Sequence, residues 1–170
     1  ELKYLINGEN IAVKIRQLLT NSSITFEEKT RTLANCYFDT SSLALRHLDM
    51  GLRVRSVDGK CEQTIKTAGV SVGGLQQRPE FNVDIEKRFP TLSLFPDNLW
   101  QNTAERDAIQ DALVSIFSTD FVRTMWLITL ENGSQVELAY DQGAISVNGR
   151  EEQIHEVELE LVKGEREELF

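Results

Sequence analysis

Three glutamates alternate with apolar residues near the end of this chain. The segment HEVELEL places Glu156, Glu158 and Glu160 two residues apart, with an apolar residue after each of them. Because residues two apart share one face of a β-strand, the segment predicts a strand with one apolar and one acidic face. Such alternation usually marks a solvated outer face. A row of carboxylates can instead bind a hard divalent cation, which relieves the repulsion among them.

Charge is grouped by sign on the other strand-like segments too. Arg53 and Arg55 share one face of GLRVRSV, whereas Glu137 and Asp141 share one face of QVELAYD. Like charges side by side destabilise a sheet by about 0.2–1 kcal/mol, so a purely structural surface would mix the signs. The grouping therefore favours a basic and an acidic surface that bind a ligand together. Further charged candidates on strand-like segments are Lys3, Lys66, Arg78, Glu80 and Arg123.

A polyphosphate suits basic and acidic surfaces that face one another. Guanidinium and ammonium groups donate hydrogen bonds to its oxygens, and carboxylates can hold the divalent cation that the phosphates also bind. This interpretation requires the charged strand faces to point inward. The predicted helices support that orientation, because amphipathic helices outside the sheet need apolar strand faces beneath them.

The order of predicted elements indicates an α+β fold. Helical spacing of apolar residues predicts helices at residues 8–19, 40–51 and 103–117. Short segments rich in β-branched and aromatic residues predict strands at 1–6, 32–39, 51–57, 61–67, 78–85, 121–130, 135–141, 144–148 and 154–161. Tight hairpins are predicted at Asp58-Gly59, Asn132-Gly133 and Asn148-Gly149, with a weaker turn signal at Gln142-Gly143. We therefore expect an antiparallel β-barrel, closed or nearly closed, with helices packed outside.

The composition sets limits on the partners of this protein. The chain has 170 residues, 41% hydrophobic and 26% charged, which suits one domain with a sizeable core. No apolar run approaches the roughly 18 residues that span a bilayer, and no secretory signal opens the chain. The net charge of −9 argues against a general nucleic-acid or anionic-membrane surface. Cys36 and Cys61 lack a CxxC spacing and are expected to be reduced thiols of a cytoplasmic protein.

The motifs, taken in order, resemble the CYTH superfamily, the triphosphate tunnel metalloenzymes. The opening ELK is similar to the second Glu and the Lys of the Glu-x-Glu-x-Lys motif of that family, and YFDTSSLALRHLDMGLRVR to its Tyr-Phe-Asp-Thr…Leu-Arg-x-Arg region. QTIKTAG, GLQQRPEF, FSTDFVRTMW, ELAYDQG and HEVELEL continue the resemblance over nearly the whole chain. GGLQQRPEF and FSTDF are most similar to the bacterial inorganic triphosphatase branch.

The resemblance implies a tunnel of eight antiparallel strands that binds a triphosphate substrate with Mg²⁺ or Mn²⁺. One metal would organise the triphosphate, and a second would help to activate the attacking water. Glu80 is expected to face the same tunnel and to pair with a basic neighbour. The expected phosphate-binding residues are Lys3, Arg53, Arg55, Lys66, Arg78 and Arg123. The expected metal ligands and acidic wall are Glu1, Glu137, Asp141, Glu156, Glu158 and Glu160. The residues expected to be essential for catalysis are Lys3, Lys66, Arg123 and Glu158.

Parts of the family pattern are absent from residues 1–170. These are the first Glu of the opening motif, a late basic segment of Ser-Lys-x-x-Arg type, and the histidine-rich helical domain that members of this branch often carry downstream. The chain begins at Glu1 without a methionine and ends in GEREELF without a turn signal. We therefore expect residues 1–170 to be a single tunnel domain, cut at both ends from a longer protein.

The expected activity is metal-dependent hydrolysis of inorganic triphosphate to pyrophosphate and phosphate. Family members also cleave thiamine triphosphate or cyclise ATP, although no residues that would hold adenine and ribose are evident. A tunnel that binds polyphosphate or nucleotide without turnover is the alternative from another class. An inert structural barrel is a further alternative, and it predicts no metal-dependent binding of triphosphate.

Overall fold

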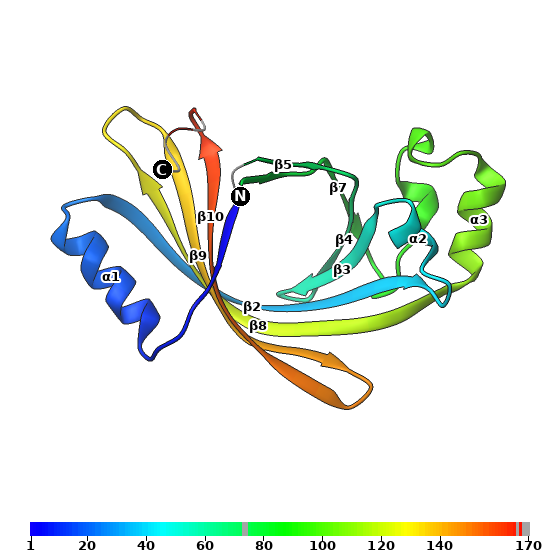
Figure 1. The fold of residues 1–170 in the computed structure, drawn as a ribbon, viewed down its shortest axis with the longest axis horizontal. Coiled ribbons are helices and arrows are strands. Elements are labelled where there is room, and N and C mark those ends of the chain that lie inside the picture. Colours follow the sequence, from blue (N-terminus) through cyan, green and yellow to red (C-terminus); the bar gives the residue numbers. More distant parts are fainter. Residues whose placement is uncertain (73–74, 166, 168–170) are drawn as a thin grey trace.

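The chain folds into one large antiparallel sheet, described by the computed structural model over residues 1–72, 75–165 and 167. Its eight strands follow the order β1-β10-β9-β8-β2-β3-β4-β7 (Figure 1). The strands are β1 (Leu2–Leu5), β2 (Thr25–Thr40), β3 (Gly51–Val57), β4 (Lys60–Lys66), β7 (Glu80–Ile85), β8 (Leu113–Thr129), β9 (Gln135–Val147) and β10 (Arg150–Lys163). A separate two-stranded sheet contains β5 (Val70–Val72) and β6 (Leu75–Gln77), on either side of residues 73–74, which lie outside the described residues.

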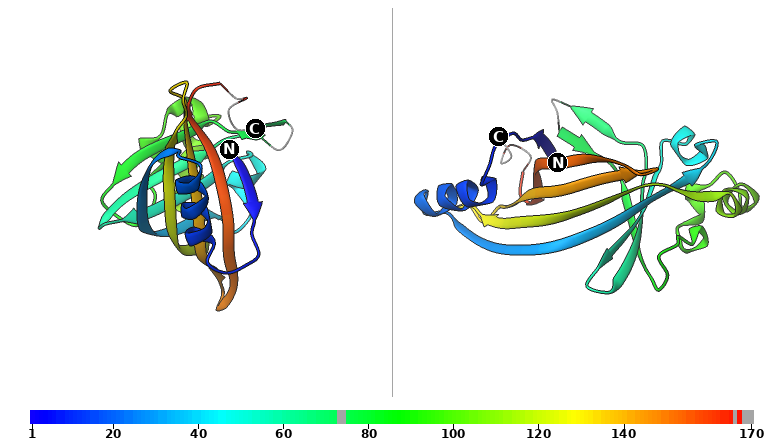
Figure 2. Two further views of the ribbon diagram at one scale, coloured as in Figure 1. Left: turned by 90° about the vertical axis from the view of Figure 1, so that its left-hand side faces the viewer. Right: turned by 90° about the horizontal axis from the view of Figure 1, so that it is seen from below.

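The helices lie on the outer face of the curved sheet. Helix α1 (Ile11–Asn21) covers one half of it, and α2 (Ala44–His47) and α3 (Thr103–Asp111) cover the other (Figures 1 and 2). Two short 3₁₀ helices, η1 (Leu92–Leu94) and η2 (Asp97–Leu99), precede α3. None of the described helices is both long and apolar enough to cross a membrane.

The sheet is strongly curved but open, which corrects the expectation of a closed or nearly closed barrel. The strand order begins at β1 and ends at β7, and no described strand pairing joins these two. The long strands β2 and β8 are paired along their whole length and form a spine. Strand β3 pairs with one end of β2, and β9 pairs with the opposite end of β8, so the two halves of the sheet extend from different ends of the spine.

The apolar strand faces point outward beneath the helices, as the sequence predicted. On one half, Leu52 and Ile65 belong to a core cluster that includes Leu45 of α2 and Ile109 of α3. On the other half, Leu19 of α1 packs in a second cluster with four strand residues: Trp126, Ile128, Tyr140 and Val157. Because side chains alternate along each strand, the charged residues between these apolar ones face the concave side.

Two expected helices are shorter in the structure. The helix expected at 103–117 ends at Asp111, and β8 begins at Leu113. Apolar residues of the segment after Asp111 fit helical spacing, but Leu113 pairs with Thr40, which extends the ladder between β8 and β2. The helix expected at 40–51 covers four residues, Ala44–His47, and Gly51 begins β3 instead of ending the helix.

Asp39 anchors the short helix α2. Its Oδ1 accepts hydrogen bonds from the backbone N–H groups of Thr40 at 2.7 Å and Leu45 at 2.9 Å. Its Oδ2 accepts from the backbone of Arg46 at 3.1 Å, and the Thr40 hydroxyl accepts from the backbone of Ala44 at 3.0 Å. The Asp-Thr pair of the YFDT motif therefore satisfies the exposed N–H groups at the start of this helix.

Two of the three strong tight-hairpin predictions are confirmed, the third lies in a hairpin with a longer loop, and the weaker turn prediction is wrong. Asp58-Gly59 and Asn148-Gly149 have positive φ at both residues, as a type I′ turn requires. Asn132-Gly133 lies in the connection between β8 and β9. Gln142-Gly143 instead lies inside the continuous strand β9, and the expected strands 135–141 and 144–148 are one.

Gly143 is required by close strand approach. A Cβ atom added there would lie 2.1 Å from the Asp120 carbonyl oxygen and 2.4 Å from Phe121 Cβ on the paired strand. These separations are far below van der Waals contact, and the nearer atom belongs to the backbone. A glycine in a strand interior can mark such an approach as well as a turn.

We expect Gly143→Ala to lower the free energy of unfolding by about 1–3 kcal/mol, because the added methyl group forces the β8 backbone away. Urea denaturation measures the change. Gly51→Ala is the matched control, since a Cβ at Gly51 meets nothing within 4 Å. Equal stability of the two variants would contradict the close approach.

Candidate functional site

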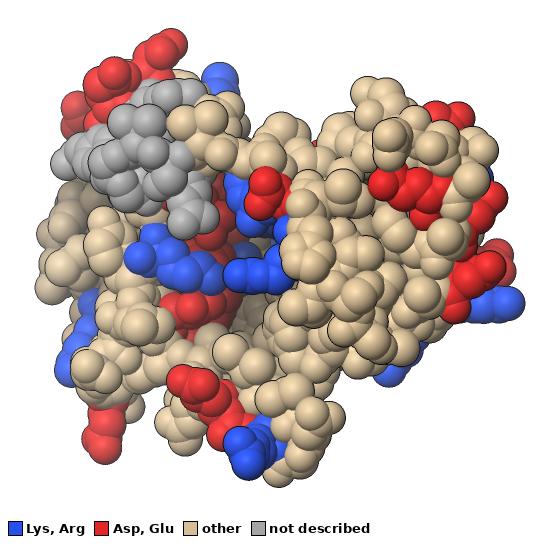
Figure 3. Space-filling view, turned by 45° about the vertical axis from the view of Figure 1, so that its right-hand side comes forward, with Lys and Arg blue, Asp and Glu red and all other residues tan. Residues whose placement is uncertain are grey.

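Cross-strand pairing gathers charged side chains of β1, β8, β9 and β10 on the concave face. Lys3 of β1 pairs with Glu158 of β10, while Glu156 of β10 pairs with Asp141 of β9. Asp141 pairs in turn with Arg123 of β8. Residues directly opposite in an antiparallel pair share a face, so these five side chains lie together. Figure 3 shows Lys and Arg atoms next to Asp and Glu atoms in the hollow between the two halves of the molecule.

Asp141, Glu156 and Glu158 form an acidic cluster on β9 and β10. Each can offer a carboxylate oxygen such that the three oxygens lie within 4.8 Å of one another. Asp141 is buried, and the two glutamates are half-buried. Hard divalent cations prefer several oxygen ligands of this kind, so the donor set of the cluster fits Mg²⁺ or Mn²⁺.

Two cationic side chains pair with the acidic cluster. Arg123 donates to Asp141 through Nε at 2.7 Å and Nη2 at 2.6 Å, and Nη2 also contacts Glu158 at 2.5 Å. Lys3 Nζ lies 2.6 Å from a Glu158 oxygen and 2.9 Å from a Glu156 oxygen. Three carboxylates therefore share two cations, and the cluster keeps an excess of negative charge.

These ion pairs shift the pKa values of their members. Burial would raise the pKa of Glu158, but Arg123 and Lys3 outweigh it and hold the pKa below its usual value of 4.5. Burial would lower the pKa of Arg123 and of Lys3, but their carboxylate partners raise both. All three groups are therefore charged over the neutral pH range.

The two arginines of β3 are held by neutral groups. We call Arg53 and Arg55 the basic wall. Arg53 Nη2 donates to the Thr64 hydroxyl at 3.3 Å, and its buried Nε has no hydrogen-bond partner among the described residues. Arg55 Nε donates to Asn35 Oδ1 at 2.8 Å. Burial, together with the positive charges of Arg53 and Arg123, lowers the pKa of Arg55 to about 10.

Lys66 and Glu80 form an ion pair beside the basic wall. Lys66 Nζ lies 3.0 Å from Glu80 Oε2, and the two residues pair across β4 and β7. This contact confirms the expected basic neighbour of Glu80. Burial would raise the pKa of Glu80, but the hydrogen bond and charge of Lys66 outweigh it and lower the pKa.

The other predicted acidic residues lie at the margin of the cluster. Glu137 of β9 pairs directly with the exposed Glu160 of β10. Burial and then the charges of neighbouring carboxylates raise the pKa of Glu137, against the opposing effect of Arg123. Glu1 directly precedes β1 and is half-buried.

Arg78 is exposed and contacts backbone groups. Its Nε donates to the Thr67 carbonyl oxygen at 2.8 Å, and its Nη2 donates to that of Asp49 at 3.0 Å. These bonds join the end of β4 to the turn after α2. The described contacts of Arg78 therefore do not bring it to the acidic cluster.

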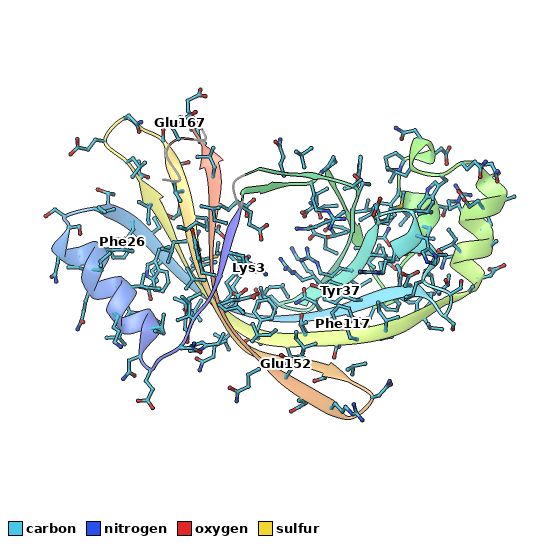
Figure 4. All side chains as sticks on the ribbon, in the orientation of Figure 1. Lys3, Phe26, Tyr37, Phe117, Glu152 and Glu167 are labelled. Atoms are coloured by element: carbon cyan, nitrogen blue, oxygen red, sulfur yellow. The ribbon has the colours of Figure 1, made fainter. Side chains whose placement is uncertain are left out.

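Several neutral residues of the concave face were not predicted from the sequence as part of the site. Thr64 donates its hydroxyl hydrogen to Asn82 Oδ1 at 2.7 Å while it accepts from Arg53. Tyr37 stacks on Phe117 with ring centroids 4.3 Å apart, and Figure 4 labels both residues on the spine strands. The signal for Thr64 was its alternation with Lys66, which puts the two on one face.

The whole chain matches a known family. The model of the CYTH domain family matches residues 1–170, and the chain therefore belongs to the CYTH family. An inorganic triphosphatase of Haemophilus influenzae is 38% identical to it over 176 aligned residues. That match covers all of this chain and 47% of the relative, so the chain spans about half the length of this curated relative.

Solved structures share the fold. A candidate adenylyl cyclase from Hippeastrum, described as having a dominant triphosphatase activity, superposes with a TM-score of 0.62 at 19% identity. That match covers 95% of this chain and 79% of the other. A candidate adenylate cyclase from Bacillus halodurans gives a TM-score of 0.54 at 25% identity, over 98% of this chain and 80% of the other.

We expect Glu158→Gln to reduce the loss of stability in acid. The folded-state pKa of Glu158 lies below 4.5, so its charge stabilises the fold above about pH 4.5 and this contribution disappears as the pH falls through the folded pKa. Urea denaturation between pH 7 and pH 3 measures the slope of the free energy of unfolding against pH. Glu152→Gln, on the same strand but exposed, should keep the wild-type slope. A wild-type slope in Glu158→Gln would contradict the expectation.

Proposed function

We propose that this domain hydrolyses inorganic triphosphate to pyrophosphate and phosphate with the help of a divalent cation. The observation that carries the proposal is the presence of the basic wall and the acidic cluster on one concave face. A triphosphate needs cationic donors for its oxygens and a hard cation to reduce its charge, and this face offers groups for both. The likeness to an inorganic triphosphatase supports the choice of substrate.

In this proposal, the basic residues bind the phosphate oxygens and the acidic residues bind the cation. The guanidinium groups of Arg53 and Arg55 and the ammonium group of Lys66 bind phosphate oxygens at the basic wall. Lys3 and Arg123 bind oxygens of the phosphate nearest the acidic cluster. The Nε of Arg53, which has no hydrogen-bond partner in the described part of the chain, is a donor that an anionic oxygen would satisfy. Arg78, which bonds two backbone carbonyls, is the weakest member of the predicted binding set.

Asp141, Glu156 and Glu158 would hold the divalent cation, with Glu1, Glu137 and Glu160 as the surrounding acidic wall. When bound, Mg²⁺ or Mn²⁺ would neutralise charge on the phosphate oxygens. Without the cation, Arg123 keeps the cluster in place through its two-point contact with Asp141. The cytoplasmic location and the downstream histidine-rich domain stay predictions from the sequence.

The first experiment is phosphate release from inorganic triphosphate, ATP and thiamine triphosphate, each with Mg²⁺, Mn²⁺ or EDTA. We expect release chiefly from inorganic triphosphate and its loss in EDTA. Preferred release from thiamine triphosphate would reassign the substrate. Formation of a cyclic nucleotide from ATP would favour a cyclase. Binding of triphosphate without any release would leave a binding module.

We expect Glu158→Ala to reduce turnover at least about 100-fold while the protein remains folded, because it removes a cation ligand and leaves Arg123 and Lys3 with fewer partners. Steady-state kinetics and circular dichroism measure the two effects. Glu152→Ala on the same strand is the control and should keep wild-type turnover. Substantial turnover in folded Glu158→Ala would remove Glu158 from the proposed site.

We expect Lys3→Gln to bind Mn²⁺ alone about 10-fold more tightly than the wild type, because the ammonium group competes with the metal for Glu156 and Glu158. The same variant should bind triphosphate more weakly. Titration calorimetry measures both affinities. Lys66→Gln is the matched control: it should weaken triphosphate binding without changing the affinity for Mn²⁺. Unchanged Mn²⁺ affinity in Lys3→Gln would show that the metal does not use these carboxylates.

A further inference from the structure

We infer that Asn35 is a positioning residue that holds the Arg55 guanidinium toward the concave face without neutralising its charge. The inference rests on the proposed function, because it takes Arg55 to be a phosphate-binding group. Asn35 lies in β2 and is only 3% exposed. Its amide has nearly the shape of a carboxylate but carries no charge.

The Asn35 amide is fixed at both of its polar atoms. Asn35 pairs with Arg55 on β3 and with Thr119 on β8, so the three residues form a row across adjacent strands. Oδ1 accepts from Arg55 Nε at 2.8 Å, and Nδ2 donates to the Thr119 hydroxyl at 3.0 Å and more weakly to its carbonyl oxygen at 3.4 Å. Because Nδ2 faces two acceptors, Oδ1 is the atom that faces Arg55.

Arg55 differs from Lys3, Lys66 and Arg123 in its partners. Lys3, Lys66 and Arg123 each lie within 4.0 Å of a carboxylate oxygen, whereas Arg55 has no such contact among the described residues. Glu62 lies directly opposite on β4 and its charge favours the charged form of Arg55, but no described ion pair within 4.0 Å joins the two. A half-buried cation without such a direct partner is costly. An anionic ligand would supply a direct partner for the Arg55 guanidinium. A carboxylate at position 35 would take that role instead and weaken the attraction for the ligand.

A purely structural role for Asn35 makes a different prediction. If its hydrogen bonds only join β2, β3 and β8, then substitution changes stability and leaves anion affinity unchanged in the folded protein. Asn35→Asp separates the two roles, because it keeps an acceptor for Arg55 Nε and can accept from the Thr119 hydroxyl. The variant therefore changes the charge with little change of shape.

The decisive measurement is the affinity for inorganic triphosphate in EDTA, by titration calorimetry, with KM and kcat in Mg²⁺ and the melting temperature alongside. We expect Asn35→Asp to weaken binding and raise KM by about 10-fold or more, the effect of losing one charge-assisted contact. We expect Asn35→Ala, which leaves Arg55 charged but free to turn, to weaken binding by about 2- to 3-fold. In both variants kcat should change much less than KM.

The double variant Asn35→Ala with Arg55→Gln tests whether Asn35 affects triphosphate binding through Arg55. Once the Arg55 charge is gone, removal of Asn35 should weaken binding no further, whereas an effect of Asn35 on binding that does not act through Arg55 would add to that of Arg55→Gln. Unchanged affinity in folded Asn35→Asp, equal losses in Asn35→Asp and Asn35→Ala, or additive effects in the double variant would each overturn the inference. Absence of triphosphate binding and turnover in the wild type would overturn the proposed function itself.

Discussion

Burial of the apolar strand faces beneath the helices determines where the charges of this protein lie. Leu52 and Ile65 pack against α2 and α3 on one half of the sheet, and Trp126 packs in the cluster under α1 on the other. A shift of any strand by one residue would move its apolar set into the concave space and its charges under a helix. The large free energy of burying these apolar side chains therefore fixes the less favourable gathering of like charges on the opposite face.

The two signs of charge are treated differently on that face. The acidic cluster is largely compensated by Arg123 and Lys3, whose contacts with it are 2.5–2.9 Å long. The basic wall is instead held by hydroxyl and amide groups, which fix its guanidinium groups without a direct ion pair among the described residues. This face therefore favours the binding of an anion, which agrees with the substrate in the proposed reaction.

Local patterns in the sequence predicted which faces carry charge but not how all the strands align. The two-residue turn at Asn148-Gly149 implies the observed pairing of Glu156 with Asp141. Along a regular hairpin, the residue numbers of the two partners in each pair add up to the same value. The same rule applied to Asn132-Gly133 would pair Arg123 with Gln142, whose side chain points to the other face. The structure pairs Arg123 with Asp141 because the loop is longer than the dipeptide signal suggests. Pairing of Lys3 with Glu158 joins distant parts of the chain and had no local signal.

Arg123 links the two regions of the concave face, since it pairs with the acidic cluster and its charge also lowers the pKa of Arg55. In the proposed site, a cation on the carboxylates would replace Arg123 and Lys3 as their counter-ions and leave both free to face an anion. The bound anion would in turn offset the repulsion between the metal and these two side chains. Each ligand would then increase the affinity for the other by the same factor, as thermodynamic linkage requires.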